Sequence, residues 1–175
     1  MSEQDNRDAL ARESKRIQEN SLYNATAHFT SAARLWRAHL ALGTVPIILG
    51  TIGGWKGLSD PAVATPSAVM WAGLCSLVAG VVGSVLSFWN LAESRVRHFT
   101  AATQYKSLEN DARRALEIHA RDEGYTDLKR RVVDLGDRYN KLNESHLQTA
   151  DWAFNKARKK ISAGLYATAT ENDPS

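Results

Sequence analysis

The stretch that decides the fold is AVMWAGLCSLVAGVVGSVLSFW, residues 68–89. It holds no Asp, Glu, Lys or Arg, and it lies inside an uncharged run of 32 residues from Pro61 to Ala92. Trp71 and Trp89 stand near its two ends, 18 residues apart. At the helical rise of about 1.5 Å per residue this separation is roughly 27 Å, close to the ~30 Å hydrocarbon thickness of a bilayer. The stretch therefore predicts a membrane-spanning helix.

A second span is predicted upstream, at about residues 35–55. Trp36 and Trp55 are 19 residues apart, and the 18 residues from Ala38 to Trp55 carry no charge. Tryptophan favours the headgroup boundary because its ring is apolar while its N–H needs a polar partner. We therefore expect a hairpin of two spans, with all four of these tryptophans as interfacial anchors.

Average composition hides this signal. The mean hydropathy is −0.36 and 23% of residues are charged, which is typical of a soluble protein. The charges are segregated, however, because Lys56 and Asp60 are the only charged residues between Ala38 and Ala92. A soluble bundle with two core helices is the alternative, and it is disfavoured because an uncharged run much longer than ~18 residues indicates a membrane span.

Basic residues predict the orientation. Arg34 and Arg37 flank the first span and Arg95 and Arg97 follow the second, whereas the intervening loop holds only Lys56. Short loops rich in Lys and Arg stay on the cytoplasmic side. We expect a multi-pass protein of the inner (plasma) membrane with both termini in the cytoplasm.

Helical spacing of apolar residues continues outside the spans. It predicts helices over 8–36, from Ser67 without interruption to Arg121, over 126–143 and over 149–164, with residues 1–7 disordered. The expected fold is an all-α membrane protein, a two-helix transmembrane hairpin with long cytoplasmic helices that form a coiled coil or helical bundle.

The expected organisation has four parts. They are an amino-terminal cytoplasmic helix (1–36), the hairpin (37–89), a cytoplasmic helical region (90–165) and a flexible tail (166–175).

Small residues recur four apart along the spans. Between helices in lipid, association depends on close backbone approach, which small residues at i and i+4 permit. These positions pack either within one hairpin or between protomers, and we expect a homo-oligomer. The candidate packing residues are Gly50, Gly54, Ala72, Ser76, Ala79, Gly80, Gly83, Ser84 and Ser87.

Hydroxyl side chains are the candidates for lining a pore: Thr44, Thr51, Ser76 and Ser84. The spans offer no charged filter, so a pore built from them would be poorly selective. The alternative role for each hydroxyl is a hydrogen bond to the backbone of its own helix.

The sequence gives little support for catalysis. It contains no HExxH, no GxSxG and no Gly-rich phosphate loop, and the five histidines are far apart in the sequence without close metal-ligand spacing. We expect neither an enzyme nor a bound metal or cofactor.

The densest basic cluster is Lys156, Arg158, Lys159 and Lys160. A basic amphipathic helix is typical of a contact with an anionic membrane surface, and it could also bind a phosphate-bearing ligand. The third interpretation is an ordinary helix end whose basic residues complement the helix dipole. Nucleic acid is not an expected partner, since 19 acidic residues balance the basic ones.

The order of elements resembles the SLATT family of prokaryotic two-transmembrane proteins. The resembling stretches are RHFTAATQYKSLENDARRAL (97–116), with His98, Ala101, Ala102, Tyr105 and Leu108, and ADWAFNKARKKI (150–161). The resemblance covers about residues 15–163.

The resemblance implies a function. SLATT proteins are proposed pore-forming effectors of prokaryotic conflict systems that permeabilise the inner membrane to stop phage propagation. It also implies a separate nucleotide-signalling or sensor protein as a partner, besides the lipid bilayer and further copies of the chain. Two alternatives are a structural membrane anchor or scaffold that recruits a cytoplasmic partner, and a constitutive small channel.

Overall fold

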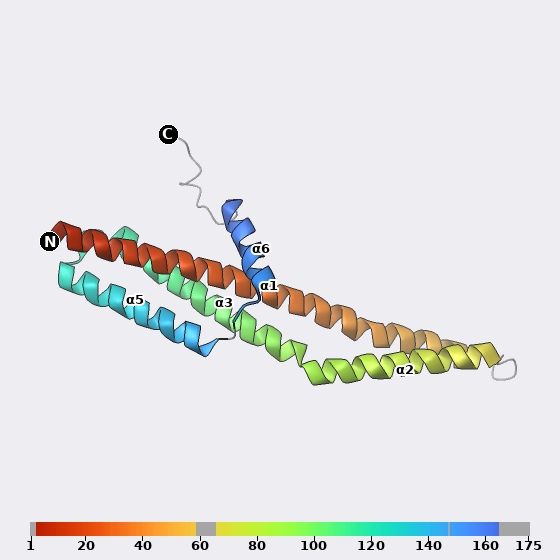
Figure 1. Cartoon of the computed structure of the whole chain (residues 1–175). Coiled ribbons are helices and arrows are strands. Elements are labelled where there is room, and N and C mark those ends of the chain that lie inside the picture. The colour runs from red at the N-terminus through yellow and green to blue at the C-terminus, as the bar shows by residue number, and fades with distance from the viewer. Residues whose placement is uncertain (1–2, 59–65, 147, 165–175) are drawn as a thin grey trace. The chain divides into compact units, whose positions relative to one another are not determined.

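The computed structural model describes residues 3–58, 66–146 and 148–164, and every regular element in these ranges is a helix (Figure 1). In chain order the elements are α1 (Glu3–Leu58), α2 (Pro66–Trp89), α3 (Leu91–Arg114), the π-helical turn η1 (Ala115–His119), α4 (Ala120–Asp122), α5 (Tyr125–Ser145) and α6 (Asp151–Ser162). The all-α class predicted from the sequence is confirmed. The tail expected to be flexible, 166–175, lies outside the described residues.

The chain divides into two compact units. Unit 1 combines the residues up to Ala32 with those from Val96 onward, and unit 2 runs from Ala33 to Arg95. Unit 2 contains both predicted spans, and unit 1 contains most of the charged helices. Helices α1 and α3 each contribute residues to both units.

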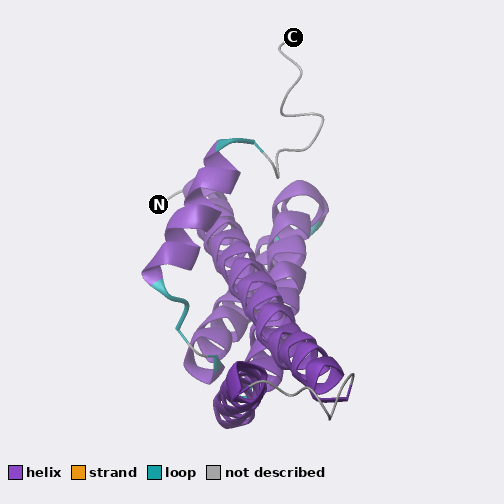
Figure 2. Ribbon diagram, turned by 90° about the vertical axis from the view of Figure 1, so that its right-hand side faces the viewer, coloured by secondary structure: helices purple, strands orange, loops and turns teal. Residues whose placement is uncertain are grey.

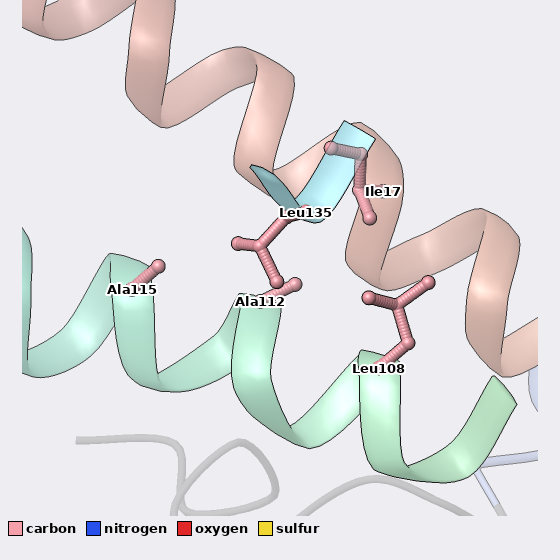
Figure 3. Close-up of a cluster of buried hydrophobic side chains, with 5 residues drawn as sticks. All are labelled: Ile17, Leu108, Ala112, Ala115 and Leu135. Carbon is pink, nitrogen blue, oxygen red and sulfur yellow. The ribbon is translucent and has the colours of Figure 1, made fainter. Parts of the chain in front are cut away.

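The core of unit 1 is small and is shared by three long helices. The amino-terminal part of α1 lies beside α3 and α5 (Figures 1 and 2). Apolar side chains meet there, and those drawn in Figure 3 are Ile17, Leu108, Ala112, Ala115 and Leu135. Leu108 is fully buried. Truncation of a buried leucine to alanine typically costs about 2–5 kcal/mol, so this one side chain is a large share of the stability of the unit.

Helix α6 packs on α1 through alanines. Ala153 and Ala157 are both 0% exposed and form a second cluster with Ala27 of α1. Phe154 packs against this cluster, and its ring lies 5.9 Å from that of Tyr23. Because alanine has no side chain beyond Cβ, the backbones of the two helices approach closely here.

The helix expected to run unbroken from Ser67 to Arg121 is interrupted at Asn90. Asn90 has φ of +39°, in the left-handed region, where asparagine is one of the few side chains tolerated. Its Oδ1 accepts a hydrogen bond from the backbone N–H of Glu93 at 3.3 Å, and its Nδ2 contacts the Glu93 carboxylate. Asn90 is therefore the N-cap of α3, and the sequence Asn-x-x-Glu is the signal that could have predicted it.

The same predicted helix changes geometry again at η1. Ala115–His119 form a π-helical turn, which is wider than an α-helical one. Ala112, just before it, accepts a hydrogen bond at its carbonyl oxygen from the Ser14 hydroxyl of α1 at 3.0 Å. No local sequence signal marks this turn.

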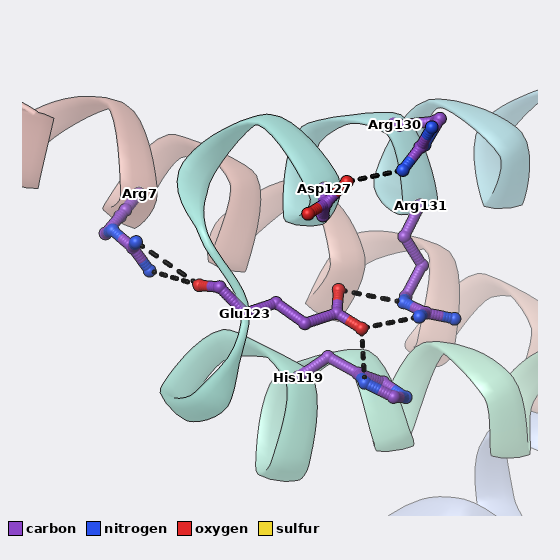
Figure 4. Close-up of polar contacts among 6 residues, drawn as sticks. All are labelled: Arg7, His119, Glu123, Asp127, Arg130 and Arg131. Atoms are coloured by element: carbon purple, nitrogen blue, oxygen red, sulfur yellow. Dashed lines mark hydrogen bonds and ion pairs between the residues drawn. The ribbon is translucent and has the colours of Figure 1, made fainter.

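Residues 3–7 are helical, contrary to the expectation of disorder over 1–7. Helix α1 begins at Glu3, and residues 1–2 lie outside the described residues. The Arg7 guanidinium donates to the carbonyl oxygen of Ala120 at 3.4 Å and to that of Glu123 at 3.3 Å. Figure 4 shows the contact with Glu123. This long-range contact ties the amino-terminal end of α1 to the turn between α4 and α5.

The Glu123 carboxylate joins that turn to α5. It accepts hydrogen bonds from Arg131 at 2.5 and 3.2 Å, and His119 Nδ1 lies 2.9 Å from it (Figure 4). The hydrogen bond from Arg131, helped by the charges of Arg131 and His119, lowers the pKa of Glu123.

Candidate functional site

Two helices are long and apolar enough to cross a membrane, and their apolar segments both lie in unit 2. None of the residues in the most apolar window of either helix is buried. Large side chains such as Ile47 (69% exposed) and Leu77 (66%) are open to the surroundings. A core helix of a soluble protein passes the same test of length and composition, but it would be mostly buried. Within the described residues, nothing covers these two apolar segments.

Helix α2 has two different faces. One is half-buried and includes Ala72, Cys75, Ala79 and Gly83, which recur every three or four residues. The other is exposed and carries the small residues Ser76, Gly80, Ser84 and Ser87. The candidate packing residues of α2 therefore divide between the two faces.

Three of the candidate glycines have open space beside them. A methyl group added at Gly50, Gly80 or Gly83 would meet no atom of the described residues within 4 Å apart from its own stretch of helix backbone. Gly50 and Gly80 are exposed, and Gly83 is half-buried. Gly54 lies in α1, but its surroundings are outside the described part of the chain.

Three of the four candidate pore-lining hydroxyls bond to their own helices. Thr44 donates to the carbonyl oxygen of Ala41 at 3.0 Å, Thr51 to that of Ile47 at 2.8 Å, and Ser84 to that of Gly80 at 2.9 Å. These three hydroxyls and Ser76 belong to exposed residues. Each of the three is satisfied within its helix and still has a lone pair available for water.

The four candidate anchors are all exposed: Trp36 is 40% exposed, Trp55 76%, Trp71 58% and Trp89 60%. Trp36 also has partners in unit 2. The Arg95 guanidinium lies 4.2 Å from the centre of a Trp36 ring, and His39 stacks on Trp36 at 6.3 Å. A cation over an indole face is attracted by the ring quadrupole, so Arg95 fixes this tryptophan in place.

The basic residues of α6 differ in exposure, and the Arg158 guanidinium lies 5.8 Å from the centre of the Phe154 ring on the packed side. Lys156, Arg158 and Lys159 are exposed and Lys160 is half-buried. The apolar surface beside them is smaller than the sequence suggests, because Ala157 is fully buried against α1. Trp152, 38% exposed, remains the largest apolar side chain on the open side of α6.

Three of the five histidines come together in unit 1, although the sequence analysis treated them as isolated. His28 Nδ1 lies 2.9 Å from His98 Nδ1, and the His146 ring lies edge-on to that of His28 with centroids 6.3 Å apart. Tyr105 stacks on His28 at 5.7 Å. We call His28, His98 and His146 the histidine cluster.

Burial changes the pKa values of residues in the cluster. His28 is 4% exposed. Burial, with the neighbouring His98 and His146, lowers the pKa of His28 to about 4. Burial also lowers the pKa of His98, and burial, with a smaller effect of Tyr139, raises the pKa of Tyr105 to about 12.

Two open cavities flank the cluster, of about 540 and 270 Å³. His28 and His146 line both of them. Among the described residues, no group of three or more His, Cys, Asp or Glu side chains is arranged to hold a metal ion.

Comparison with known proteins finds no match. No family model, curated protein or solved structure matches the chain.

The sequence does contain a signal for the histidine cluster. His28 continues the buried positions Ile17, Ser21 and Ala25 of α1 at spacings of three or four, and His98 precedes Ala101 and Ala102 in the same way on α3. Each histidine therefore lies on the buried face of its own helix, where it is expected to contact the neighbouring helix. The spacing between histidines along the sequence, which is the usual metal-site signal, carries no such information.

Proposed function

We propose that the chain is an oligomeric effector of the prokaryotic inner membrane that permeabilises this membrane in antiphage or abortive-infection defence. The observation that carries the proposal is the combination of two unburied apolar helices with a row of small residues that face outward from α2. The assignment to defence depends on the resemblance to the SLATT family in residues 97–116 and 150–161.

Lipid can cover the large apolar side chains of unit 2, but it makes few van der Waals contacts with small residues such as Gly80 and Ser84. A helix of a second copy makes more contacts at these positions, because small residues allow its backbone to approach closely. The absence of any neighbour within 4 Å of an added Cβ at Gly50, Gly80 and Gly83 supports this role. These glycines are not needed for contacts inside one chain.

In the proposed topology both termini are cytoplasmic and unit 1 is a cytoplasmic helical bundle that holds the hairpins in the oligomer. A separate nucleotide-signalling or sensor protein would supply the trigger. On triggering, the spans rearrange around Pro46, which cannot donate a backbone hydrogen bond inside α1 and so weakens the helix there.

The basic side of α6 fits this topology. Lys156, Arg158 and Lys159 would face the anionic inner leaflet, where each basic residue close to the surface contributes about 1 kcal/mol of attraction. The exposed Trp152 ring on the same helix suits the headgroup boundary.

The decisive experiment compares Gly80→Leu with Val81→Leu during induced expression. Both positions are exposed, and a Cβ at Gly80 has open space around it, so we expect Leu at either position to leave the fold of a single chain undisturbed. We expect the wild type and Val81→Leu to collapse the membrane potential and admit a dye. Gly80→Leu should insert normally but leave the potential intact. Toxic expression at normal potential would count decisively against a permeabilising role.

A membrane scaffold is the second candidate, and the separate buried core of unit 1 favours it. In that role the spans only anchor and a cytoplasmic partner is recruited. The same variant separates the two functions, since Gly80→Leu would then leave both toxicity and co-purification of the partner unchanged.

A further inference from the structure

The histidine cluster joins three segments that are distant in the sequence. His28 comes from α1, His98 from α3, and His146 follows the last residue of α5. The contacts between them are direct, at 2.9 Å between the Nδ1 atoms of His28 and His98. His146 is held in turn by Gln104 of α3, whose Oε1 lies 2.5 Å from His146 Nε2.

The contact between His28 and His98 depends on the number of protons present. A hydrogen bond between two ring nitrogens needs one N–H and one lone pair. The neutral pair satisfies this. A first added proton keeps the hydrogen bond but places a positive charge on a buried ring, which already weakens the closed state. A second proton removes the last lone pair and places two like charges in contact, so the contact must break.

Few groups around the histidine cluster can stabilise a positive charge on it. From α3, Tyr105 stacks on His28, and its hydroxyl donates to Asn143 Oδ1 at 2.7 Å. The charged side chains that line the larger cavity beside the cluster are Arg97 of α3 and Glu144 of α5. They carry opposite charges and are both exposed, so neither one stabilises a multiply protonated cluster on its own.

We propose that the histidine cluster is a proton-sensitive latch, which holds α1 against α3 and the segment after α5 when neutral and releases them when it takes up protons. The latch is a property of unit 1 and does not depend on the proposed membrane activity. None of the three histidines belongs to the apolar core around Leu108, so the core can persist when the latch opens.

The direction and size of the effect follow from linkage. Folding favours the neutral form of His28, because its pKa falls from 6.5 to about 4 when buried. The contribution to stability is therefore complete above pH 6.5 and is lost as the pH falls towards 4. For this one histidine the opening constant rises about 30-fold between pH 8 and pH 5.

The test is amide hydrogen exchange of the full chain in detergent micelles at pH 8 and pH 5, corrected for intrinsic exchange rates. In the wild type, protection of residues 24–30 and 98–106 should fall at least about 30-fold at the lower pH, while the helix around Leu128 should change much less. His119→Gln is the matched control, because His119 lies in the same unit but contacts Glu123. It should behave like the wild type.

His28→Asn should lose most of this pH dependence, because asparagine cannot take up a proton. Protection in the wild type that does not depend on pH would overturn the proposal, as would an unchanged pH dependence in the variant. If His28→Asn does not fold, NMR titration of the wild-type histidines decides the question. The latch requires one of them to titrate near pH 4, and ordinary titration of all five near 6.5 would exclude it.

Discussion

The Ser14 hydroxyl of α1 donates a hydrogen bond to the carbonyl oxygen of Ala112 in α3 across 3.0 Å, and Ser14 is only 1% exposed. This bond joins the two helices just before the π-helical turn. Ser14→Ala would leave a buried carbonyl with a lost partner, so we expect a loss of about 1–2 kcal/mol in the free energy of unfolding. Chemical denaturation of the full chain in micelles, followed by circular dichroism, measures it. Thr103→Ala is the control, because Thr103 is exposed and bonds within its own helix, to Thr100. Equal losses in the free energy of unfolding for the two substitutions would show that the buried hydrogen bond between α1 and α3 does not stabilise the protein more than an exposed one.

Gly136 is a glycine inside α5 that has room for a methyl group. A Cβ there would lie 4.0 Å from Ile17 Cδ1, an ordinary van der Waals contact. Alanine is also the better helix former by about 1 kcal/mol. We therefore expect Gly136→Ala to raise the free energy of unfolding by about 1 kcal/mol.

The matched control is Asn140→Ala, one turn further along α5 and exposed. It changes helix propensity without adding a contact and should give a smaller gain. A loss of stability with Gly136→Ala would mean that α1 and α5 are closer at this point than the structure has them.

The carboxylate of Glu123 makes unit 1 sensitive to acid. Its pKa is lowered, so its stabilising effect is present above its ordinary value of 4.5 and disappears as the pH falls through the lower folded value. Glu123→Gln should reduce stability at pH 7 and flatten the pH dependence below about 4.5. Thermal unfolding at pH 7 and pH 3.5 measures both effects. Asp134→Asn, which removes an exposed carboxylate elsewhere on α5, is the control and should lower stability at pH 7 less than Glu123→Gln does.

Asn90 should tolerate glycine but not alanine. Glycine adopts positive φ without strain and costs only a few tenths of a kcal/mol as an N-cap, whereas alanine loses the cap and is strained at +39°. We expect a loss of about 1–2 kcal/mol for Asn90→Ala and much less for Asn90→Gly. Thermal unfolding in micelles compares them, and equal losses would show that the left-handed conformation is not what Asn90 supplies.

The helices and the two apolar segments could be predicted from the sequence because their signals are local. Charge segregation around residues 68–89 and the three-to-four spacing of apolar residues do not depend on what the helices contact. The continuity of α1 through residues 8–36 into the first span follows from the same lack of breakers. Its start at Glu3 could not be predicted, because the helix is extended by the contact of Arg7 with Glu123, over a hundred residues away.

The candidate site was predicted less completely. The small residues of α2 are visible in the sequence, but only burial separates the face of Ala79 from that of Gly80. The histidine cluster depends on the relative register of α1 and α3, and no spacing within one helix fixes that register. The π-helical turn has no propensity signal, since Ala115 and Leu116 are ordinary helix formers.

The wide turn at Ala115–His119 has a consequence for the register of everything after it. A π-helical turn is equivalent to one extra residue inserted into a regular α-helix, so the side chains beyond it are rotated by about 100° relative to those before it. Ala112 before the turn and Ala120 and Glu123 after it all present their carbonyl oxygens to α1, to Ser14 and to Arg7 respectively. Deleting a single residue within the turn would regularise the helix and rotate Ala120 and Glu123 away from Arg7, even though no contacting side chain had been changed.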